Sequence, residues 1–147
     1  MPIICSFFGH RNISENIKSV LYTEIENHIK KNKVDVFYVG GYGQFDRMAS
    51  GILHELKDRY PHISVYHVLA YIPTGAKKES FEKEQPTLYP NGLETVPRKF
   101  AITYRNRIMI DQSDYVVGYV RMCYGGAYEA LKYAERKNKN IVNLATG

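Results

Sequence analysis

Three glycine-containing turns carry the residues of this sequence whose types and spacing could do chemistry. They are Gly9-His10-Arg11, Gly40-Gly41-Tyr42-Gly43 and Tyr124-Gly125-Gly126. Each follows a short apolar run and precedes a stretch of helical periodicity, which is typical of a turn between a strand and a helix. Such turns present unpaired backbone N–H groups, and phosphate is their usual ligand. The three turns therefore indicate a site for a phosphate-bearing molecule.

The spacing within these turns excludes two common phosphate-binding motifs. No Gly-Lys-Ser or Gly-Lys-Thr follows any of them, and none has the G-x-G-x-x-G spacing of dinucleotide-binding proteins. A P-loop ATPase and an ordinary NAD dehydrogenase are therefore not predicted, and we expect no resident cofactor. We also expect no metal site, because the two cysteines form no CxxC pair and have no histidine at metal-ligand spacing.

Two arginines are candidates to hold the phosphate. Arg11 directly follows the first apolar run and would reach the mouth of the site. Arg105 shares the inward stripe of its predicted helix with Ile102 and Ile108, and a buried arginine needs a partner. That partner is either a ligand phosphate or an internal carboxylate, and the sequence favours neither. The internal candidates are Asp46, Asp111 and Glu129.

Two further side chains could take part in acid–base chemistry. Glu129 lies in the first turn of the helix that follows Gly125-Gly126, where the helix dipole favours a carboxylate. We expect it to face the site, where it would orient a ribose or act as an acid or base. His10 could carry a proton, although a histidine at the end of a strand is more often a hydrogen-bonded structural residue.

The elements that must position these residues alternate between strands and helices. Apolar runs predict strands at residues 3–8, 35–39, 63–72, 115–120 and 140–144. Helices are predicted after each of the first two strands and at residues 101–112 and 126–137. Their candidate N-caps include Ser14 and Asp46, and the first helix is expected to bury Ile17, Val20 and Leu21.

This alternation predicts an α/β fold: a Rossmann-like three-layer sandwich with a mainly parallel, five-stranded sheet. If the strand order is 3-2-1-4-5, the first and fourth strands flank the point at which that order reverses, and all three turns converge on one cleft. Residues 73–97 stand outside the pattern, with four of the six prolines and a charged stretch in which a short helix at 78–84 is plausible. Segments of this kind are either lids or mobile insertions.

The bulk properties are those of one small domain. The 147 residues predict a single domain over residues 1–147. The net charge of +5 allows an anionic partner, but the lysines and arginines are spread over helix faces, so we prefer a solvated surface to a nucleic-acid patch. No run approaches the length of a membrane span, so we expect a cytoplasmic protein with no membrane partner. Cys5 falls within a predicted strand and is expected to be a reduced core residue.

The turns, taken together with residues 105–126, resemble the SLOG superfamily, a Rossmann-like group that includes the LOG phosphoribohydrolases and the DprA-type proteins. Phe7-Phe8-Gly9-His10-Arg11 is similar to the F-x-G-H-R of its uncharacterised YpsA-like branch. Residues 40–46 and the segment from Arg105-Asn106-Arg107 to Gly125-Gly126 are similar to that branch's G-G-x-x-G-x-D and R-N-R-x-M…S…G-G. The resemblance covers nearly the whole chain and implies a nucleotide-related ligand held by the glycine turns.

One departure separates the sequence from the LOG phosphoribohydrolases. Their P-G-G-x-G-T-x-x-E motif ends in a glutamate that acts in cleaving the bond between base and ribose phosphate. Alignment on Gly125-Gly126 places Tyr128 on the third glycine, Glu129 on the threonine and Lys132 on that glutamate. Arg105 matches the family arginine. The arginine is thus kept and the acid is lost or moved.

Three functions follow as hypotheses. The first is binding or sensing of a nucleotide or nucleotide-derived ligand, with its phosphate on the Gly125-Gly126 helix start near Arg11 or Arg105 and its base near Tyr42 or Tyr128. The expected binding residues are Gly9, His10, Arg11, Gly40, Gly41, Gly43, Asp46, Arg105, Gly125 and Gly126. The second is an N-glycosidase acting on nucleoside monophosphates, with Glu129 as acid or base and Arg105 holding the phosphate. The third is binding of single-stranded nucleic acid by the basic, tyrosine-rich surface. A homodimer is a further hypothesis, because small nucleotide sites are often completed by a neighbouring subunit.

Overall fold

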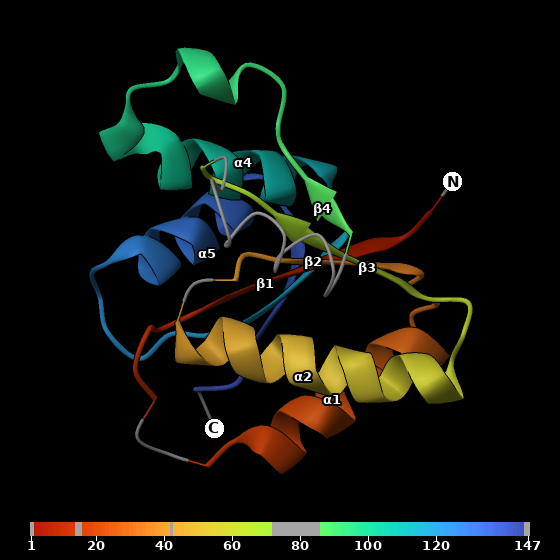
Figure 1. The fold of residues 1–147 in the computed structure, drawn as a ribbon. Coiled ribbons are helices and arrows are strands. Elements are labelled where there is room, and N and C mark those ends of the chain that lie inside the picture. The colour runs from red at the N-terminus through yellow and green to blue at the C-terminus, as the bar shows by residue number, and fades with distance from the viewer. Residues whose placement is uncertain (1, 14–15, 42, 72–85, 146–147) are drawn as a thin grey trace.

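A parallel β-sheet forms the middle layer of the protein, and helices cover both of its faces (Figure 1). The computed structural model describes residues 2–13, 16–41, 43–71 and 86–145. The strands are β1 (Ile4–Gly9), β2 (Val36–Val39), β3 (Ser64–Val68), β4 (Thr87–Leu88), β5 (Tyr115–Tyr119) and β6 (Asn140–Asn143). The helices are α1 (Lys18–Lys30), α2 (Gln44–Arg59), α4 (Ala101–Gln112) and α5 (Gly126–Arg136), with short 3-10 helices at Leu93–Thr95 and Arg98–Phe100.

The order of the strands is β4-β3-β2-β1-β5-β6, and every neighbouring pair is parallel. The predicted order 3-2-1-4-5 is therefore confirmed, with one strand added at the edge. That strand, β4, pairs with the end of β3 within a segment for which no strand was predicted. The chain builds outward from β1 to β4 and then returns to place β5 on the other side of β1. Its direction of travel thus reverses between β1 and β5, which is where ligands bind in folds of this kind.

Two apolar cores, one on each face, hold the helices to the sheet. Helices α1 and α2 cover one face, where Phe7, Phe37 and Phe45 are buried together with Leu21 and Ile25. Helices α4 and α5 cover the other face over a second group that includes Phe8, Val116, Met109 and Leu131. Each fully buried side chain of this size contributes roughly 1.5–3 kcal/mol through the hydrophobic effect. The two cores together fix the ends of β1 and β5.

The structure corrects some expected details of the elements. Val20 is 54% exposed, because the inward stripe of α1 continues from Leu21 through Ile25 and His28, and Val20 lies on the opposite side of the helix. β3 ends at Val68, four residues before the predicted end. The candidate cap Ser14 and the candidate helix at 78–84 lie outside the described residues. In the part of the chain that is described, no helix is long and apolar enough to cross a membrane.

Candidate functional site

A cleft of about 250 Å³ opens where β1 and β5 end, on the side of the sheet covered by α4 and α5. It is lined by Phe8, Gly9, Arg11, Asp46, Ile102, Arg105, Asn106, Gly126 and Ala127. These residues come from β1, from the turn after it and from the first halves of α2, α4 and α5. Five of them are among the residues singled out in the sequence: Gly9, Arg11, Asp46, Arg105 and Gly126. The cleft therefore lies at the switch point of the sheet, as expected for a ligand site.

The start of α5 offers unpaired donors beside this cleft. Gly125 precedes the helix with φ +98° and ψ 171°, a conformation that is open essentially only to glycine. The first helical hydrogen bond runs from Glu129 N–H to the Gly125 carbonyl. The N–H groups of Gly126, Ala127 and Tyr128 precede that bond and donate to no other described residue. Together with the helix dipole they form a site that attracts an anion.

The start of α2 positions Arg11. The N–H of Gln44 donates to the Arg11 carbonyl at 2.7 Å, and the Gln44 side-chain oxygen accepts from Ile13 N–H at 2.8 Å. Gly43 lies against this turn with φ +95°, and a Cβ there would meet the Arg11 Cα at 2.8 Å. The backbone of Arg11 is thus held in place. Its side chain is exposed at the cleft and makes no hydrogen bond or ion pair to a described residue.

Asp46 does not cap α2. Gly43 occupies the N-cap position and the helix begins at Gln44, so Asp46 is its third residue. The reason is the glycine conformation at residue 43, which starts the helix three residues earlier than the polar side chain suggests. Asp46 is only 6% exposed and lines the cleft, where it supplies a buried carboxylate close to the start of a helix.

Arg105 is 4% exposed, and much of its hydrogen-bonding capacity is used within the protein. Its Nη1 donates to the carbonyls of Gly40 at 3.0 Å and Val68 at 3.3 Å. Its Nε and Nη2 donate to the Asn106 side-chain oxygen at 3.1 and 2.6 Å. The three acceptor atoms of these four hydrogen bonds are neutral oxygens. Arg105 thus joins the ends of β2 and β3 to α4 and brings a positive charge to the cleft.

Gly40 of the turn after β2 contacts Arg105, and the described residues of this turn do not line the cleft. A Cβ at Gly40 would lie 2.8 Å from the Arg105 Nη1, so a larger residue would displace the guanidinium. Gly41 has φ +79° and lies against the His67 ring. The three turns therefore contribute unequally: two line the cleft, and the third holds its buried arginine.

His10 is bonded within the protein and is absent from the cleft lining. Its Nε2 accepts from the N–H groups of Arg121 at 2.8 Å and Met122 at 3.3 Å, and its ring meets that of Tyr119 edge-on. The structural reading of this histidine fits these contacts. Glu129 is exposed and also absent from the lining, so it does not face the cleft as expected. Asp111, another suggested partner of Arg105, accepts from the Tyr133 hydroxyl at 2.7 Å.

Sequence reasoning missed four residues of the lining: Phe8, Ile102, Asn106 and Ala127. Asn106 accepts two hydrogen bonds from the Arg105 guanidinium. Its position directly after Arg105 in the sequence was the one signal that could have marked it as a residue of the site. Phe8, Ile102 and Ala127 are apolar and supply shape. Because they resemble any other core residue in sequence, their roles appear only when the strands and helices are assembled.

A second hollow of about 270 Å³ lies beside α4, between Tyr38, Leu88 and Gln112. All its lining residues are uncharged, and the Tyr38 hydroxyl donates to the Gln112 side chain at 3.0 Å. Burial, with a smaller contribution from Tyr66, raises the pKa of Tyr38 and keeps it neutral. This hollow is as large as the cleft but offers no charge to an anion.

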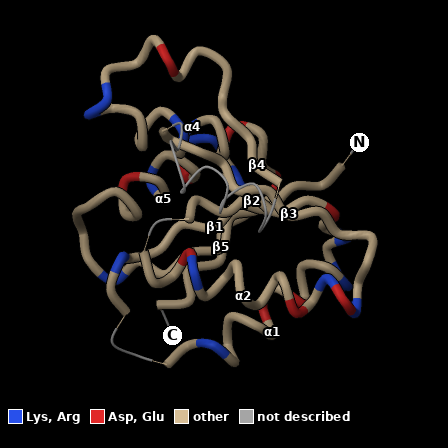
Figure 2. Tube along the Cα trace, in the orientation of Figure 1, with Lys and Arg blue, Asp and Glu red and all other residues tan. Residues whose placement is uncertain are grey.

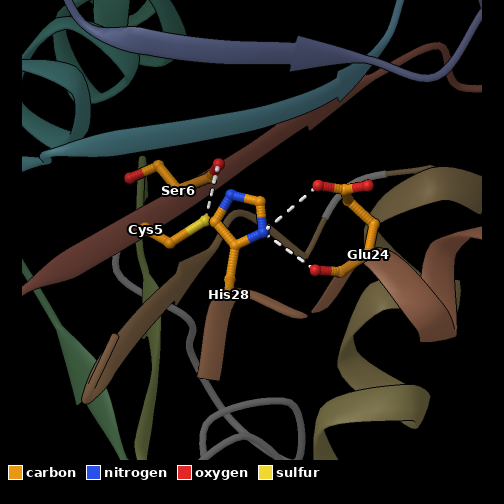
Figure 3. Close-up of polar contacts among 4 residues, drawn as sticks. All are labelled: Cys5, Ser6, Glu24 and His28. Carbon is orange, nitrogen blue, oxygen red and sulfur yellow. Dashed lines mark hydrogen bonds and ion pairs between the residues drawn. The ribbon is translucent and has the colours of Figure 1, made fainter. Parts of the chain in front are cut away.

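Cys5, Glu24 and His28 form a cluster of residue types that can serve as a nucleophile with its base, but here they are part of the core (Figure 3). The Cys5 thiol is fully buried and directed toward the Ser6 carbonyl at 3.8 Å, and burial raises the pKa of Cys5 strongly. His28 is 2% exposed, and its Nδ1 donates to the Glu24 carbonyl at 2.8 Å. A thiol that is protonated and shielded from solvent is inert. Cys5 is thus confirmed as a core residue.

Charged residues of both signs are interspersed along the described helices and turns (Figure 2). Several cations lie over aromatic rings, for example Arg107 at 5.2 Å and Lys137 at 5.4 Å from the Tyr133 ring centroid. Among the described residues no group of three or more His, Cys, Asp or Glu side chains could hold a metal ion. The charged side chains in the lining of the cleft are those of Arg11, Asp46 and Arg105.

The fold is of the Rossmann-like α/β type, and comparison with known proteins finds it in solved structures. The sequence matches no protein-family model and no curated protein. Solved structures do match. DNA processing protein A (DprA) from Streptococcus pneumoniae aligns with 95% of this chain at 16% identity and a TM-score of 0.68. DprA from Helicobacter pylori, described by its single-stranded DNA binding mode, aligns with 95% at 21% identity and a TM-score of 0.66.

A third structure, the Moco carrier protein from Chlamydomonas reinhardtii, aligns with 100% of this chain at 15% identity and a TM-score of 0.57. The alignments cover 49% and 64% of the two DprA chains and 78% of the carrier protein. The chain therefore spans between about half and two thirds of the length of those DprA chains. At these identities the likeness establishes the fold.

Proposed function

We propose that the protein binds a nucleotide, or a nucleotide-derived molecule, in the cleft between β1 and β5. The observation that carries the proposal is the joint lining of this cleft by Arg11, Arg105 and the unpaired start of α5 at Gly126. Two guanidinium charges and a helix start are the groups that recognise phosphate. The resemblance of the glycine turns to the YpsA-like branch of the SLOG superfamily supports a nucleotide as the bearer of that phosphate.

The groups divide the ligand between them. The phosphate accepts hydrogen bonds from the first-turn N–H groups of α5 and from the exposed Arg11 guanidinium. The buried Arg105 contributes its charge from the cleft lining. The Asp46 carboxylate accepts hydrogen bonds, so it suits hydroxyl groups of a sugar. The base lies toward Tyr128, which is half-buried at the start of α5. Tyr42, the other aromatic residue expected near the base, lies outside the described residues.

The size of the cleft fits part of such a ligand. Pockets that enclose a whole drug-sized molecule measure roughly 300–1,000 Å³. At about 250 Å³ the cleft is slightly smaller than that range. It accommodates the phosphate and sugar, and the base remains near the mouth. A dinucleotide would extend well beyond it.

A thermal-shift series tests this proposal. The four ribonucleoside 5′-monophosphates are added to the wild-type protein, and at least one is expected to raise Tm, because a ligand that binds only the folded state stabilises it. Arg11→Gln removes an exposed charge and no described contact, so its unliganded Tm stays the same while the shift shrinks. Arg136→Gln, at the far end of α5, is the matched control and keeps the full shift. A flat response to all four nucleotides would contradict the proposal.

The N-glycosidase alternative rests on a different carboxylate from the one suggested by the sequence. Glu129 lies outside the cleft lining, whereas Asp46 and Arg105 both belong to it. Under this alternative Asp46 acts on the ribose of a bound nucleoside monophosphate. Release of free base is measured by chromatography, with Asp46→Asn abolishing it and Glu129→Gln sparing it. If no base is released from any of the four monophosphates, the alternative is rejected and binding remains.

A second alternative is binding of single-stranded DNA, favoured by the likeness in fold to the H. pylori protein known for that activity. Phosphate contacts made by arginines release counterions, so affinity for a DNA strand falls steeply with salt. Fluorescence anisotropy with a labelled oligothymidylate at 50 and 200 mM salt provides the test. Binding at both concentrations without a salt dependence, or no binding at either, excludes this reading.

A further inference from the structure

One imidazole nitrogen accepts hydrogen bonds from two backbone amides of the loop between β5 and α5. The His10 Nε2 lies 2.8 Å from the Arg121 nitrogen and 3.3 Å from the Met122 nitrogen. Both partners are N–H donors, so Nε2 is the acceptor and carries no proton. The neutral ring therefore has its proton on Nδ1. An imidazolium has no acceptor nitrogen, so protonation of His10 removes both hydrogen bonds together.

The loop has few other attachments. Val120 is tied to Asn143, since its N–H donates to the Asn143 side chain and its carbonyl accepts from the same amide, each at 3.0 Å. After that point residues 121–126 are all exposed, including Met122 at 51% and Tyr124 at 68%. Met122, Cys123 and Tyr124 make no further backbone hydrogen bond to a described residue. The His10 ring thus connects two amides of this exposed loop to the residue that follows β1.

The position of His10 makes it a suitable anchor. Its own N–H donates to the Tyr119 carbonyl at 3.2 Å, and its ring meets the Tyr119 ring edge-on at 6.3 Å. It is therefore fixed to β5 on one side and holds the loop that follows β5 on the other. Gly125 follows three residues after Met122, and its backbone conformation sets the direction of α5 and of the unpaired N–H groups of that helix.

We infer that neutral His10 is the positioning residue for the start of α5, and that its protonation releases the loop and weakens anion binding there. The binding half of this inference rests on the proposed function, whereas the loop half does not. The ring contacts Tyr119 of β5 and the Arg121 and Met122 amides of the loop, and the next residue in the chain, Arg11, is charged.

The positioning role and a direct phosphate contact predict opposite changes of anion affinity with pH. If His10 touched the phosphate, its added positive charge would strengthen binding as the pH fell. A positioning role predicts the opposite, because the donors at the start of α5 lose their alignment. The two roles are therefore separated by the direction of one pH dependence.

Solvent-exchange NMR of the loop amides tests the loop half without any ligand. Protection factors for Arg121 and Met122 are measured at pH 7.5 and 5.0, with the Val120 amide as an internal control. We expect a fall of about tenfold for the two loop amides, in line with the loss of one ordinary hydrogen bond each, and no change at Val120. His10→Gln, whose side-chain oxygen reaches the Nε2 position, removes the pH dependence. Unchanged protection at pH 5.0 would overturn the inference.

Calorimetry with adenosine 5′-monophosphate tests the binding half. The ratio of the wild-type Kd to the His10→Gln Kd is followed from pH 7.5 to 5.0, which cancels the titration of the phosphate itself. We expect the ratio to rise by about tenfold, matching the loss of loop protection. A falling ratio would show that His10 contacts the phosphate and would overturn the inference. If nucleotides fail to bind at any pH while the loop amides still respond, the proposed function fails and the positioning role stands.

Discussion

At the scale of single residues, the two arginines of the cleft have different tasks. Arg11 is exposed and its side chain is uncommitted among the described residues, whereas Arg105 is buried and bonded to Gly40, Val68 and Asn106. The sequence predicted that Arg105 would be buried, because it shares a helical stripe with apolar residues. It could not predict the carbonyl partners Gly40 and Val68, because they lie at the ends of two strands far away in the chain.

Replacing Arg105 by methionine is expected to lower the free energy of unfolding by about 3 kcal/mol, because buried carbonyl groups lose their donor. Urea denaturation measures the change. Arg136→Gln, on an exposed arginine of α5, serves as the control and is expected to stay within about 0.5 kcal/mol of wild type. Equal stability of Arg105→Met and wild type would contradict the structural task given to this residue.

The outward direction of Glu129 could have been predicted from the sequence. Ala127 lines the cleft, and Ala130 and Leu131 are buried beneath α5. Residues two apart on a helix point about 200° apart, so a helix that turns Ala127 inward turns Glu129 toward solvent. The helix dipole depends on the position of Glu129 along the helix axis, but whether Glu129 faces the cleft depends on its direction around that axis.

Cys5 gives the protein a predictable response to alkaline pH. Its folded-state pKa is raised from the ordinary 9.0 by burial, so above pH 9 the unfolded state loses the thiol proton and the folded state keeps it. Stability is therefore full below pH 9 and falls above it, by up to about 1.4 kcal/mol per pH unit. Denaturation curves between pH 8 and 10 measure the slope, and Cys5→Ala is expected to flatten it. An equally steep slope in that variant would assign the effect elsewhere.

At the scale of elements, α2 and α5 begin in the same way. Gly43 and Gly125 both precede their helices with φ near +95° and ψ near 175°, and neither helix has a side-chain cap. Sequence patterns located the glycines but assigned the cap of α2 to Asp46, because a polar cap is the commoner solution. The ends of most elements agree with prediction within about two residues. β4 was missed because a two-residue strand between prolines carries no periodic signal.

Two alanine substitutions in and before α2 are expected to have opposite effects. Gly43→Ala places a Cβ 2.8 Å from the Arg11 Cα in a backbone conformation that disfavours it, so we expect a loss of about 2–3 kcal/mol. Gly51, in the interior of the same helix, has open space around it, and Gly51→Ala is expected to stabilise by about 0.5–1 kcal/mol. Thermal or urea unfolding of the pair gives both values. A tolerated Gly43→Ala would remove the proposed reason for glycine there.

At the scale of the whole molecule, the fold follows from alternation and the cleft from topology. Alternating strands and helices predicted a parallel sheet, and the predicted order placed β1 and β5 side by side, as observed. The same order brings the turns after β1 and β5 to one edge of the sheet. The volume of the cleft and the identity of its apolar wall depend on how α4 packs against α5, which no local pattern records.

The most direct test of the central claim is to map nucleotide binding onto the protein by NMR. Adenosine 5′-monophosphate is titrated into labelled wild-type and Arg11→Gln protein while the backbone amides are followed. We expect saturable shifts at Gly9, Gly126 and Ala127, with affinity reduced about tenfold in Arg11→Gln, as for the loss of one charge-assisted hydrogen bond. Shifts confined to the uncharged hollow around Tyr38 and Gln112, or affinity equal in the two proteins, would contradict it.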